Sequence, residues 1–541
     1  MAYGAIDHAG DQALARPYLD RFEAAKAHRT EAEGLWERTG QFLNTSSAIA
    51  HDRDKGELRA KLRLDMTMQL ANKRLAAMLV GLLFSPWSRF IEGYLRFKEP
   101  SHEEAIYLER MSDQGHERLT MQGSSWNVAI YEALGDMCGY GNGCLWGEES
   151  PSRGLVVQSQ NIMDIWIDQN EFDELDTVFR KRKLRADRAA KLYQTPKLVD
   201  LAERHPDHMV ELVQCVMPRS DGLPGKPGAQ KPFKSVIIDL THGQALVEGG
   251  YDEFPCVYLR FQRRAGALYG TGPGIDATPM QYVRNALMDA TLRNAELNND
   301  PPIMAPSNFI RGFDRRVLGL TTYDESFLWK TSGRPQGAIF QLPVGGNTSV
   351  GMQMLQQLEA AIMAHYYADW MQPGEVDRMS ATEVLDRRDT RLRMLGPLTA
   401  QVGRDIQPFA ERHFSVLARQ GKLEDAPASM DGDDIAWRLV SPLQRIQQGQ
   451  AVEEMLRGLN SIAAVGQQAA SVDPVLRADE YAREIAIMAG TPKAFIRSAD
   501  EIAQRRNDAA QADAAEQQAK IASLAAPAVA AGAQMQTALE R

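Results

Sequence analysis

The stretch Tyr269–Asp300 reads YGTGPGIDATPMQYVRNALMDATLRNAELNND, a glycine-rich turn that runs into a long helical pattern. In its second part, apolar residues recur at helical spacing on one side, at Met280, Val283, Leu287, Ala290 and Leu297. This stripe is too narrow for a helix that is buried on all sides and too regular for a fully solvated helix. We therefore expect a long helix over about 279–300 with a single packing face.

A second helical pattern, TSVGMQMLQQLEAAIMAHYYADWM, spans 348–371 and has its apolar stripe at Leu355, Leu358, Ile362, Tyr366 and Trp370. Between the two patterns, the segment from Pro301 to about Pro343 predicts turns and short strands. With roughly 20 to 24 residues each, the helices are about 30–36 Å long. A pair of long helices that carries a small module suggests a stalk.

The sequence before this pair of helices changes from helical patterns to strand patterns. Apolar periodicity predicts helices over 15–43 and 64–84, and the stretch 126–149 predicts a helix, a glycine-rich turn and a strand. From about 155 to 259, short β-branched and aromatic runs predict strands, which a helical insert at 185–208 interrupts. These patterns predict an α+β fold that is mainly helical.

After the second helix, the turn formers in MQPGE (371–375) predict a loop. Residues 380–383 have the spacing of a capping box, which predicts the start of a long helix that Pro397 and Pro408 should bend. The Ala- and Gln-rich tail from Asp508 predicts either a weakly held helix or partial disorder.

The composition excludes several classes of protein. The formal net charge of −10 argues against a basic, general nucleic-acid binder, although it leaves room for a local basic surface. The spacing of the four cysteines suits neither a zinc site nor a disulfide scaffold, which predicts reduced thiols in the core. The N-terminus has no apolar signal-peptide core, and the apolar run at 75–87 is too short to span a membrane. We therefore expect a protein that is made and folded in a cytoplasm.

The motifs that mark enzymes are absent from this sequence. The turn YGTGPG lacks the G-x-G-x-x-G spacing of a dinucleotide site and has no following Gly-Lys-Ser/Thr. His205 and His208 are better explained as exposed loop residues than as metal ligands. The stretch YLRFQRRAGALY (258–269) is better explained as a half-buried edge strand with solvated arginines than as a surface that stacks on nucleotides. The sequence therefore predicts no catalytic residue, no metal and no cofactor, and it points to a structural or assembly role.

Several local patterns occur in an order that resembles the head-to-tail connector, or portal, family of short-tailed bacteriophages. The resemblance covers about Arg16 to Arg506. The patterns are LAAMLVGLLFSPWSRF (75–90), YEALGDMCGYGNGCLW (131–146), RFQRRAGALYGTGPGIDATPMQYVRN (260–285), RMSATEVLDRRDTRLRMLGPLTAQVGRDIQPFAERHFSVLARQGKL (378–423) and AGTPKAFIRSADEIAQRR (489–506).

The resemblance implies a portal fold and a ring, usually of twelve copies, at one vertex of a capsid. Double-stranded DNA would be packaged through the channel by the terminase and later ejected, and the ring would dock the tail. Carried onto this chain, the family architecture comprises a wing at 1–270 with its β-rich part at about 155–262, stem helices at 271–298 and 347–371, a small α/β clip at 299–346, a tunnel loop at 372–381, a long kinked helix and wing return at 382–440, a helical crown at 441–510, and a tail at 511–541.

The resemblance also implies where the functional residues lie. The tunnel loop would face DNA with Pro373, Gly374, Glu375, Asp377 and Arg378. The clip would contact DNA, terminase or adaptor through Arg311, Arg315, Arg316, Lys330 and Arg334. The stem would pack against neighbouring subunits through Met280, Val283, Leu287, Leu355, Leu358, Ile362 and Tyr366. Mixed charge in the loop suits DNA that slides, because a lasting grip on phosphate would act as a brake.

The implied partners are further copies of the chain, the large terminase subunit, tail adaptor and tail proteins, major capsid and scaffold proteins, and double-stranded DNA, without a membrane. The expected location is the head–tail junction of a virion, after assembly in the cytoplasm of a bacterial host. The alternative is another assembly component, a tail adaptor or a scaffold; an enzyme subunit of the packaging motor is less favoured. Adaptors are usually much shorter, scaffolds are usually more charged, and a motor subunit needs a nucleotide loop that this sequence lacks.

Overall fold

The computed structural model describes residues 12–43, 64–121, 124–219, 231–299, 303–306, 320–323, 340–341, 348–368, 394–430, 435–440 and short stretches within 452–520. The chain divides into two units, unit 1 with residues 1–87 and 117–422, and unit 2 with residues 88–116 and 423–541. The described residues are mainly helical and their strands form separate sheets, which confirms the predicted α+β class.

The larger sheet of unit 1 is antiparallel, and helices cover both of its faces. Its strands, in the order β4-β5-β6-β7-β8, span Ile165–Gln169, Leu175–Arg185, Met209–Pro218, Phe233–Asp239 and Gln244–Tyr251. Helix α1 (Gln12–Gly40) packs on one face, where the ring of Phe22 contacts Trp166 and Phe179. Helices α7 (Ala186–Tyr193) and α8 (Pro196–Arg204) pack on the other face.

The second sheet of unit 1 has the order β3-β2-β9, with strands at Gly154–Gln160, Asn142–Ser150 and Cys256–Arg260. Helix α6 (Trp126–Tyr140) packs against β2 and β3, and α14 (Gly396–Arg419) packs against β3 and β9. The two helices meet at Trp126 and Phe409, whose rings stack with centroids 4.8 Å apart. A short 3-10 helix, η1 (Ile162–Asp164), leads from β3 into β4.

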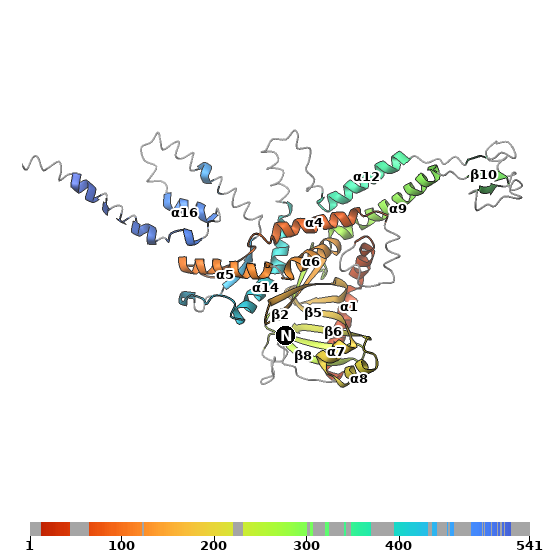
Figure 1. Cartoon of the computed structure of the whole chain (residues 1–541), viewed down its shortest axis with the longest axis horizontal. Coiled ribbons are helices and arrows are strands. Elements are labelled where there is room, and N and C mark those ends of the chain that lie inside the picture. The colour runs from red at the N-terminus through yellow and green to blue at the C-terminus, as the bar shows by residue number, and fades with distance from the viewer. Residues whose placement is uncertain are drawn as a thin grey trace, which may run out of the picture. The chain divides into compact units, whose positions relative to one another are not determined.

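The two long helices predicted from the apolar stripes are present and lie side by side (Figure 1). They are α9 (Pro273–Asn299) and α12 (Thr348–His365), and both contact α4 (Thr67–Leu83). With 27 residues, α9 is about 40 Å long. The last residues of the second predicted helix, 369–371, lie outside the described residues.

A contact between main chains joins the start of α9 to the end of α6. Gly141 ends α6 with φ at 76°, a conformation that glycine adopts without steric cost, and a β-carbon there would lie 2.4 Å from the carbonyl carbon of Thr271. The buried Asn142 seals the contact, because its amide donates to the carbonyl oxygens of Tyr140 and Gly270 and its oxygen accepts from the Gly270 N–H. The glycine-rich stretches GYGNGC (139–144) and YGTGPG (269–274) were predicted as two separate turns. In the structure they contact each other and form one junction.

Short strands occur in the segment where turns and strands were predicted between the two long helices. They are β10 (Ile303–Pro306), β11 (Leu320–Tyr323) and β12 (Phe340–Gln341), in the order β11-β10-β12. Strand β10 pairs parallel with β11 and antiparallel with β12.

Unit 2 joins residues from distant parts of the chain. Strand β1 (Ile91–Leu95) pairs antiparallel with β13 (Ile435–Leu439), so that Gly93 lies opposite Trp437. Most of α5 (His102–Thr120) belongs to this unit, which also contains η4 (Ala428–Met430), α16 (Ala478–Met488) and η5 (Lys493–Phe495). Ser101 and Glu104 cap the start of α5 reciprocally, each accepting a hydrogen bond from the main-chain N–H of the other.

Some local predictions are wrong. Pro397 lies in the first turn of α14, where its missing N–H costs nothing, and Pro408 lies inside the same helix. Residues 380–393, where the predicted helix begins, lie outside the described residues. Arg260 was predicted to be solvated, but it is buried in the edge strand β9. Leu35, an apolar residue within the helical pattern of 15–43, is 40% exposed. Among the described residues, no helix combines the length and the hydropathy that crossing a bilayer requires.

Candidate functional site

The α9–α12 pair has one side that is buried within the chain. On α9, Ala277, Gln281 and Arg284 are buried, one helical turn after another. Leu355 and Ile362 on α12 and Tyr366 directly after its end are also buried, and burial raises the pKa of the Tyr366 hydroxyl well above its usual value. The partners of this side are α4, which contacts both long helices, and α6, which contacts α9.

This burial concerns three residues of the predicted stem interface. Leu355, Ile362 and Tyr366 were expected to pack against neighbouring subunits, but the chain's own helices already cover them. The apolar stripe indicated correctly that α12 has a packing face, because helical periodicity reports burial. It carried no information on whether the covering residues belong to the same chain.

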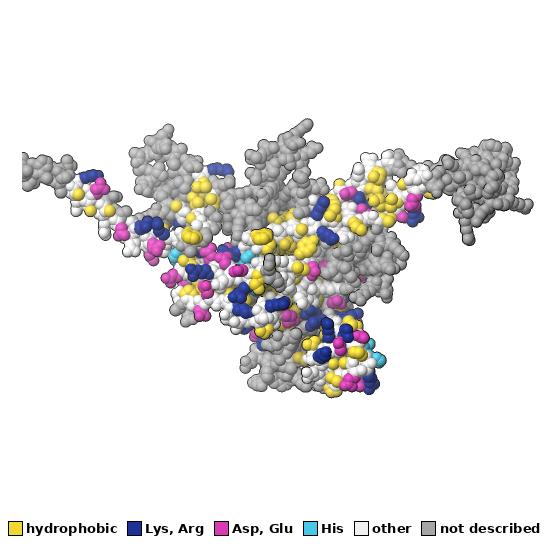
Figure 2. All heavy atoms as spheres, viewed as in Figure 1, with side chains coloured by type: hydrophobic (Ala, Val, Ile, Leu, Met, Phe, Trp, Pro, Cys, Tyr) yellow, Lys and Arg dark blue, Asp and Glu magenta, His cyan; other side chains and the backbone are white. Residues whose placement is uncertain are grey.

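The other side of the pair exposes large apolar side chains. Val283, from the predicted interface, is 54% exposed, while Met280, Leu287 and Leu358 are half-buried. The space-filling view shows hydrophobic side chains gathered over the two helices (Figure 2). The exposed set on these helices comprises Tyr282, Val283, Leu292, Leu297, Val350, Met352 and Met354. Exposed large apolar side chains gathered on two neighbouring helices are typical of a site of protein association.

Arg284 ties the two long helices to a third segment. Its Nε donates to Asp65 Oδ2 at 2.9 Å, its Nη2 donates to Glu359 Oε2 at 3.0 Å, and its Nη1 donates to the carbonyl oxygen of Leu355. Asp65 precedes α4, and Leu355 and Glu359 lie on α12. A single guanidinium group therefore sets the position of α9 relative to both neighbours.

Asp65 is buried and surrounded by donors. Gln281 Nε2 donates to its Oδ2 at 2.9 Å, and the main-chain N–H and the hydroxyl of Thr67 also donate to it. Burial alone would raise the pKa of Asp65, but the hydrogen bonds from Arg284 and Gln281 outweigh it and lower this pKa below its usual value. The carboxylate is thus held charged where it anchors the start of α4.

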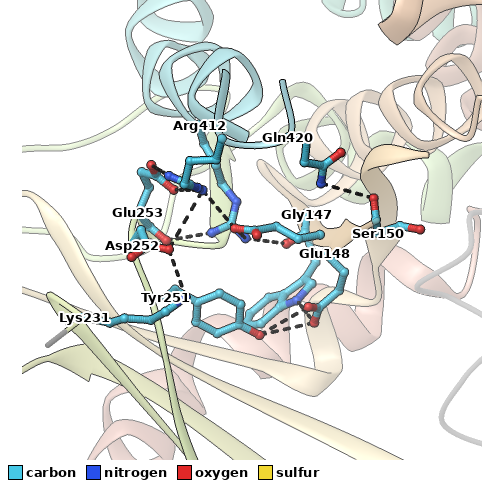
Figure 3. Close-up of polar contacts among 12 residues, drawn as sticks. Gly147, Glu148, Ser150, Lys231, Tyr251, Asp252, Glu253, Arg412 and Gln420 are labelled. Carbon is cyan, nitrogen blue, oxygen red and sulfur yellow. Dashed lines mark hydrogen bonds and ion pairs between the residues drawn. The ribbon is translucent and has the colours of Figure 1, made fainter. Parts of the chain in front are cut away.

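Helix α14 is fastened to the second sheet by a buried arginine (Figure 3). The guanidinium of Arg412 donates to the carbonyl oxygens of Gly147 at 3.2 Å and Glu253 at 2.6 Å, and it lies 5.1 Å from the ring centre of Tyr251. Burial lowers the pKa of Arg412, although a guanidinium keeps its charge in proteins. The two carbonyl oxygens replace the water molecules that would hydrate the guanidinium if it were exposed.

A more exposed cluster surrounds that contact. Arg419 pairs with Glu253 at 2.5 Å and with Glu149 at 3.0 Å, and its side chain is 38% exposed. Gln420 donates to the carbonyl oxygen of Ser150 at 3.2 Å. On the sheet side, the Tyr251 hydroxyl donates to Glu148, which also accepts from the Trp146 indole at 2.7 Å (Figure 3). The second half of α14 is therefore held at several points.

The sequence patterns did not single out either arginine, although a signal was present. Arg284 and Arg412 each stand on the apolar face of a helical pattern, where a charge requires a partner. The identity of that partner could not be predicted, because Asp65 is 219 positions from Arg284 and Gly147 is 265 positions from Arg412.

Two groups of predicted functional residues lie outside the described residues. They are the tunnel-loop set Pro373, Gly374, Glu375, Asp377 and Arg378, and the clip set Arg311, Arg315, Arg316, Lys330 and Arg334. Of the other candidates, His205 and His208 are exposed at the turn between α8 and β6, as expected. Arg263, from the basic and aromatic stretch, pairs with Asp173 at 2.5 Å.

Comparisons with known proteins agree on one family. Residues 15–496 match the model of the family described as "Bacteriophage head to tail connecting protein". The chain is 23% identical over 531 residues to the "Probable portal protein" of Bordetella phage BPP-1, covering 93% of this chain and 92% of that protein. It is 21% identical over 522 residues to the "Portal protein" of Salmonella phage epsilon15, covering 92% of each. The similarity extends through both units.

Proposed function

Because this chain belongs to the bacteriophage head-to-tail connecting, or portal, family, we propose that twelve copies form a ring at one capsid vertex. As a family member it is a structural component of the virion that connects head and tail. The proposed ring encloses a channel through which the terminase packages double-stranded DNA and through which the DNA later leaves. It also docks the tail through adaptor proteins and contacts the capsid and its scaffold.

The exposed apolar side of the α9–α12 pair is the observation that supports this proposal. Val283 on α9 and Val350 on α12 are each at least half exposed, although both lie on long regular helices. A head-to-tail contact between identical subunits covers such a surface on every copy if the rotation closes into a ring. The opposite side is already covered within the chain in the first half of α9 and at Leu355 and Ile362 of α12, so the exposed side remains for a neighbour.

Within the ring we assign the DNA-facing role to the loop after α12. Pro373, Gly374, Glu375, Asp377 and Arg378 would line the narrowest part of the channel. Acidic and basic residues are mixed there, which limits the release of counterions from DNA and keeps the duplex free to slide. The clip arginines and Lys330 would contact DNA, the terminase or the adaptor.

Electron microscopy of the purified protein tests the ring directly, by subunit counting and the presence of a central hole. Val283→Lys should prevent rings while the circular dichroism spectrum stays unchanged, because it places a charge in the proposed contact. Asn298→Lys adds the same charge at an exposed polar position of α9 and should leave rings intact. A wild-type chain that stays monomeric at high concentration would refute the proposal.

The channel and clip assignments require tests on assembling particles. Deletion of 374–378 should leave rings intact but reduce the DNA in filled heads, and normal filled heads would exclude a channel location. Reversal of the charges of Arg315 and Arg316 together should impair packaging by rings that still form. Unchanged packaging would remove these two residues from the proposed contact.

A further inference from the structure

Two cysteines that are distant in the sequence lie in contact inside unit 1. Cys144 is on β2 and Cys256 is the first residue of β9, and their sulfur atoms are 3.5 Å apart although 112 positions separate them. In the antiparallel register, Cys144 lies opposite Tyr258 and Cys256 lies opposite Trp146. The cysteines are therefore diagonal neighbours on adjacent strands.

All four cysteines of the chain, Cys138, Cys144, Cys215 and Cys256, are free and buried. What distinguishes Cys144 and Cys256 is that each is the nearest reaction partner of the other, on strands that the sheet already holds in register. A disulfide needs the sulfur atoms at about 2.0 Å, so side-chain rotation with a small shift of the strands closes the gap. No rearrangement of domains is required.

We propose that Cys144 and Cys256 form an oxidation site, at which a peroxide converts the thiol pair into a disulfide bond. Hydrogen peroxide oxidises the thiol of Cys256 to a sulfenic acid and is reduced to water. The sulfur of Cys144 then attacks the sulfenic sulfur, a second water leaves, and the sulfur–sulfur bond forms. The pair loses two electrons and two protons in total, which the peroxide takes up.

The surroundings of the pair set the order and the speed of these steps. Cys256 begins the edge strand of its sheet and is 5% exposed, whereas Cys144 is completely buried, so the oxidant meets Cys256 first. Burial and the contact with Cys256 raise the pKa of Cys144 well above its usual value. Because the thiolate is the reactive form, closure is slow while the protein is folded.

The bond would join β2 to β9, close to the two main-chain carbonyl groups that hold Arg412 of α14. Gly147, three residues after Cys144, and Glu253, three residues before Cys256, offer the carbonyl oxygens that Arg412 binds. A disulfide at this place fixes the register of β2 and β9 and with it the position of these acceptors. A virion component is made in a reducing cytosol and later leaves the cell, so oxidation would follow release. This timing rests on the family assignment, whereas the chemistry of the pair does not.

Peptide mapping of the full-length protein tests the proposal. Folded protein is treated with hydrogen peroxide, unfolded, alkylated without a reducing agent and digested. A peptide pair linked through Cys144 and Cys256 should accumulate and should disappear on treatment with dithiothreitol. Cys138 and Cys215 are internal controls, because they are as deeply buried as Cys144 and should remain available for alkylation.

Cys256→Ser is the matched variant, with its folding checked by circular dichroism. In this variant Cys144 should stay reduced. Peroxide should raise the melting temperature of the wild type and leave that of the variant unchanged. The proposal is overturned if folded wild-type protein yields no linked peptide, or if Cys138 and Cys215 are oxidised as fast as the pair. Subunit counting by electron microscopy on the same samples reports on the ring independently.

Discussion

A β-carbon on Gly274 would lie 2.1 Å from the carbonyl oxygen of Gly139, because the first turn of α9 touches the last turn of α6 main chain to main chain. Gly143 is equally close to the carbonyl oxygen of Ala133. Real β-carbons do not approach another atom so closely, and the obstacle is a helix backbone, not a flexible side chain. The junction thus sets where the long helix α9 begins.

Gly274→Ala should therefore be strongly destabilising. Overpacking of a rigid contact costs about 1–3 kcal/mol, and this one should lie at the upper end or abolish soluble expression. Chemical denaturation followed by circular dichroism measures the loss. Gly135→Ala is the control, since a β-carbon at that position of α6 meets no atom within 4 Å and alanine favours a helix. Equal effects of the two substitutions would contradict the close contact.

Arg284→Ala should cost about 3–5 kcal/mol, because it leaves the buried carboxylate of Asp65 without its cation. The free energy of unfolding from denaturant titration measures this loss. Arg293→Ala removes an arginine of the same helix whose side chain is 72% exposed, and it should cost less than about 1 kcal/mol. Asp65→Asn should restore part of the stability of Arg284→Ala, because it removes the unpaired charge. A double variant less stable than Arg284→Ala would count against the ion pair.

The two arginines of α14 should differ in their response to salt. Arg412→Lys should cost about 1–3 kcal/mol at any ionic strength, because a lysine cannot serve two buried carbonyl groups with the geometry of a guanidinium. Arg419→Gln should cost less than about 1 kcal/mol, and this effect should vanish in about 1 M salt, where exposed ion pairs are screened. Thermal unfolding at low and high salt separates the two cases. The same salt dependence for both would contradict the difference in burial.

Glu104 should make the start of α5 sensitive to acid. The main-chain N–H of Ser101 and the ammonium group of Lys98 lower the pKa of Glu104 from 4.5 to about 2. Because the folded pKa is the lower one, its stabilising contribution is complete above pH 4.5 and is lost as the pH falls toward 2. Glu104→Gln should therefore destabilise at pH 7 but cause little further loss at about pH 2–3. Melting temperatures across this pH range test the sign, with the exposed neighbour Glu103→Gln as control. A stabilising effect of Glu104→Gln at pH 7 would contradict the lowered pKa of Glu104.

Local patterns were enough to locate the main elements. The helices α4, α6, α9 and α12 and the strands between 155 and 259 were predicted, because side chains three or four residues apart on a helix, or two apart on a strand, share one environment. The order of these elements, together with short motifs, also pointed to the family to which the chain belongs. Both kinds of information are contained in residues close together in the chain.

Local patterns could not predict which residues pack against each face of a helix or strand. Periodicity showed that Val283 and Ile362 belong to apolar stripes, but folding alone buries Ile362 within the chain and leaves Val283 exposed. The ion pair of Arg284 with Asp65, the glycine junction and the contact of Cys144 with Cys256 each join residues more than 100 positions apart. Such contacts depend on how whole helices and strands pack against one another, and no local spacing records that packing.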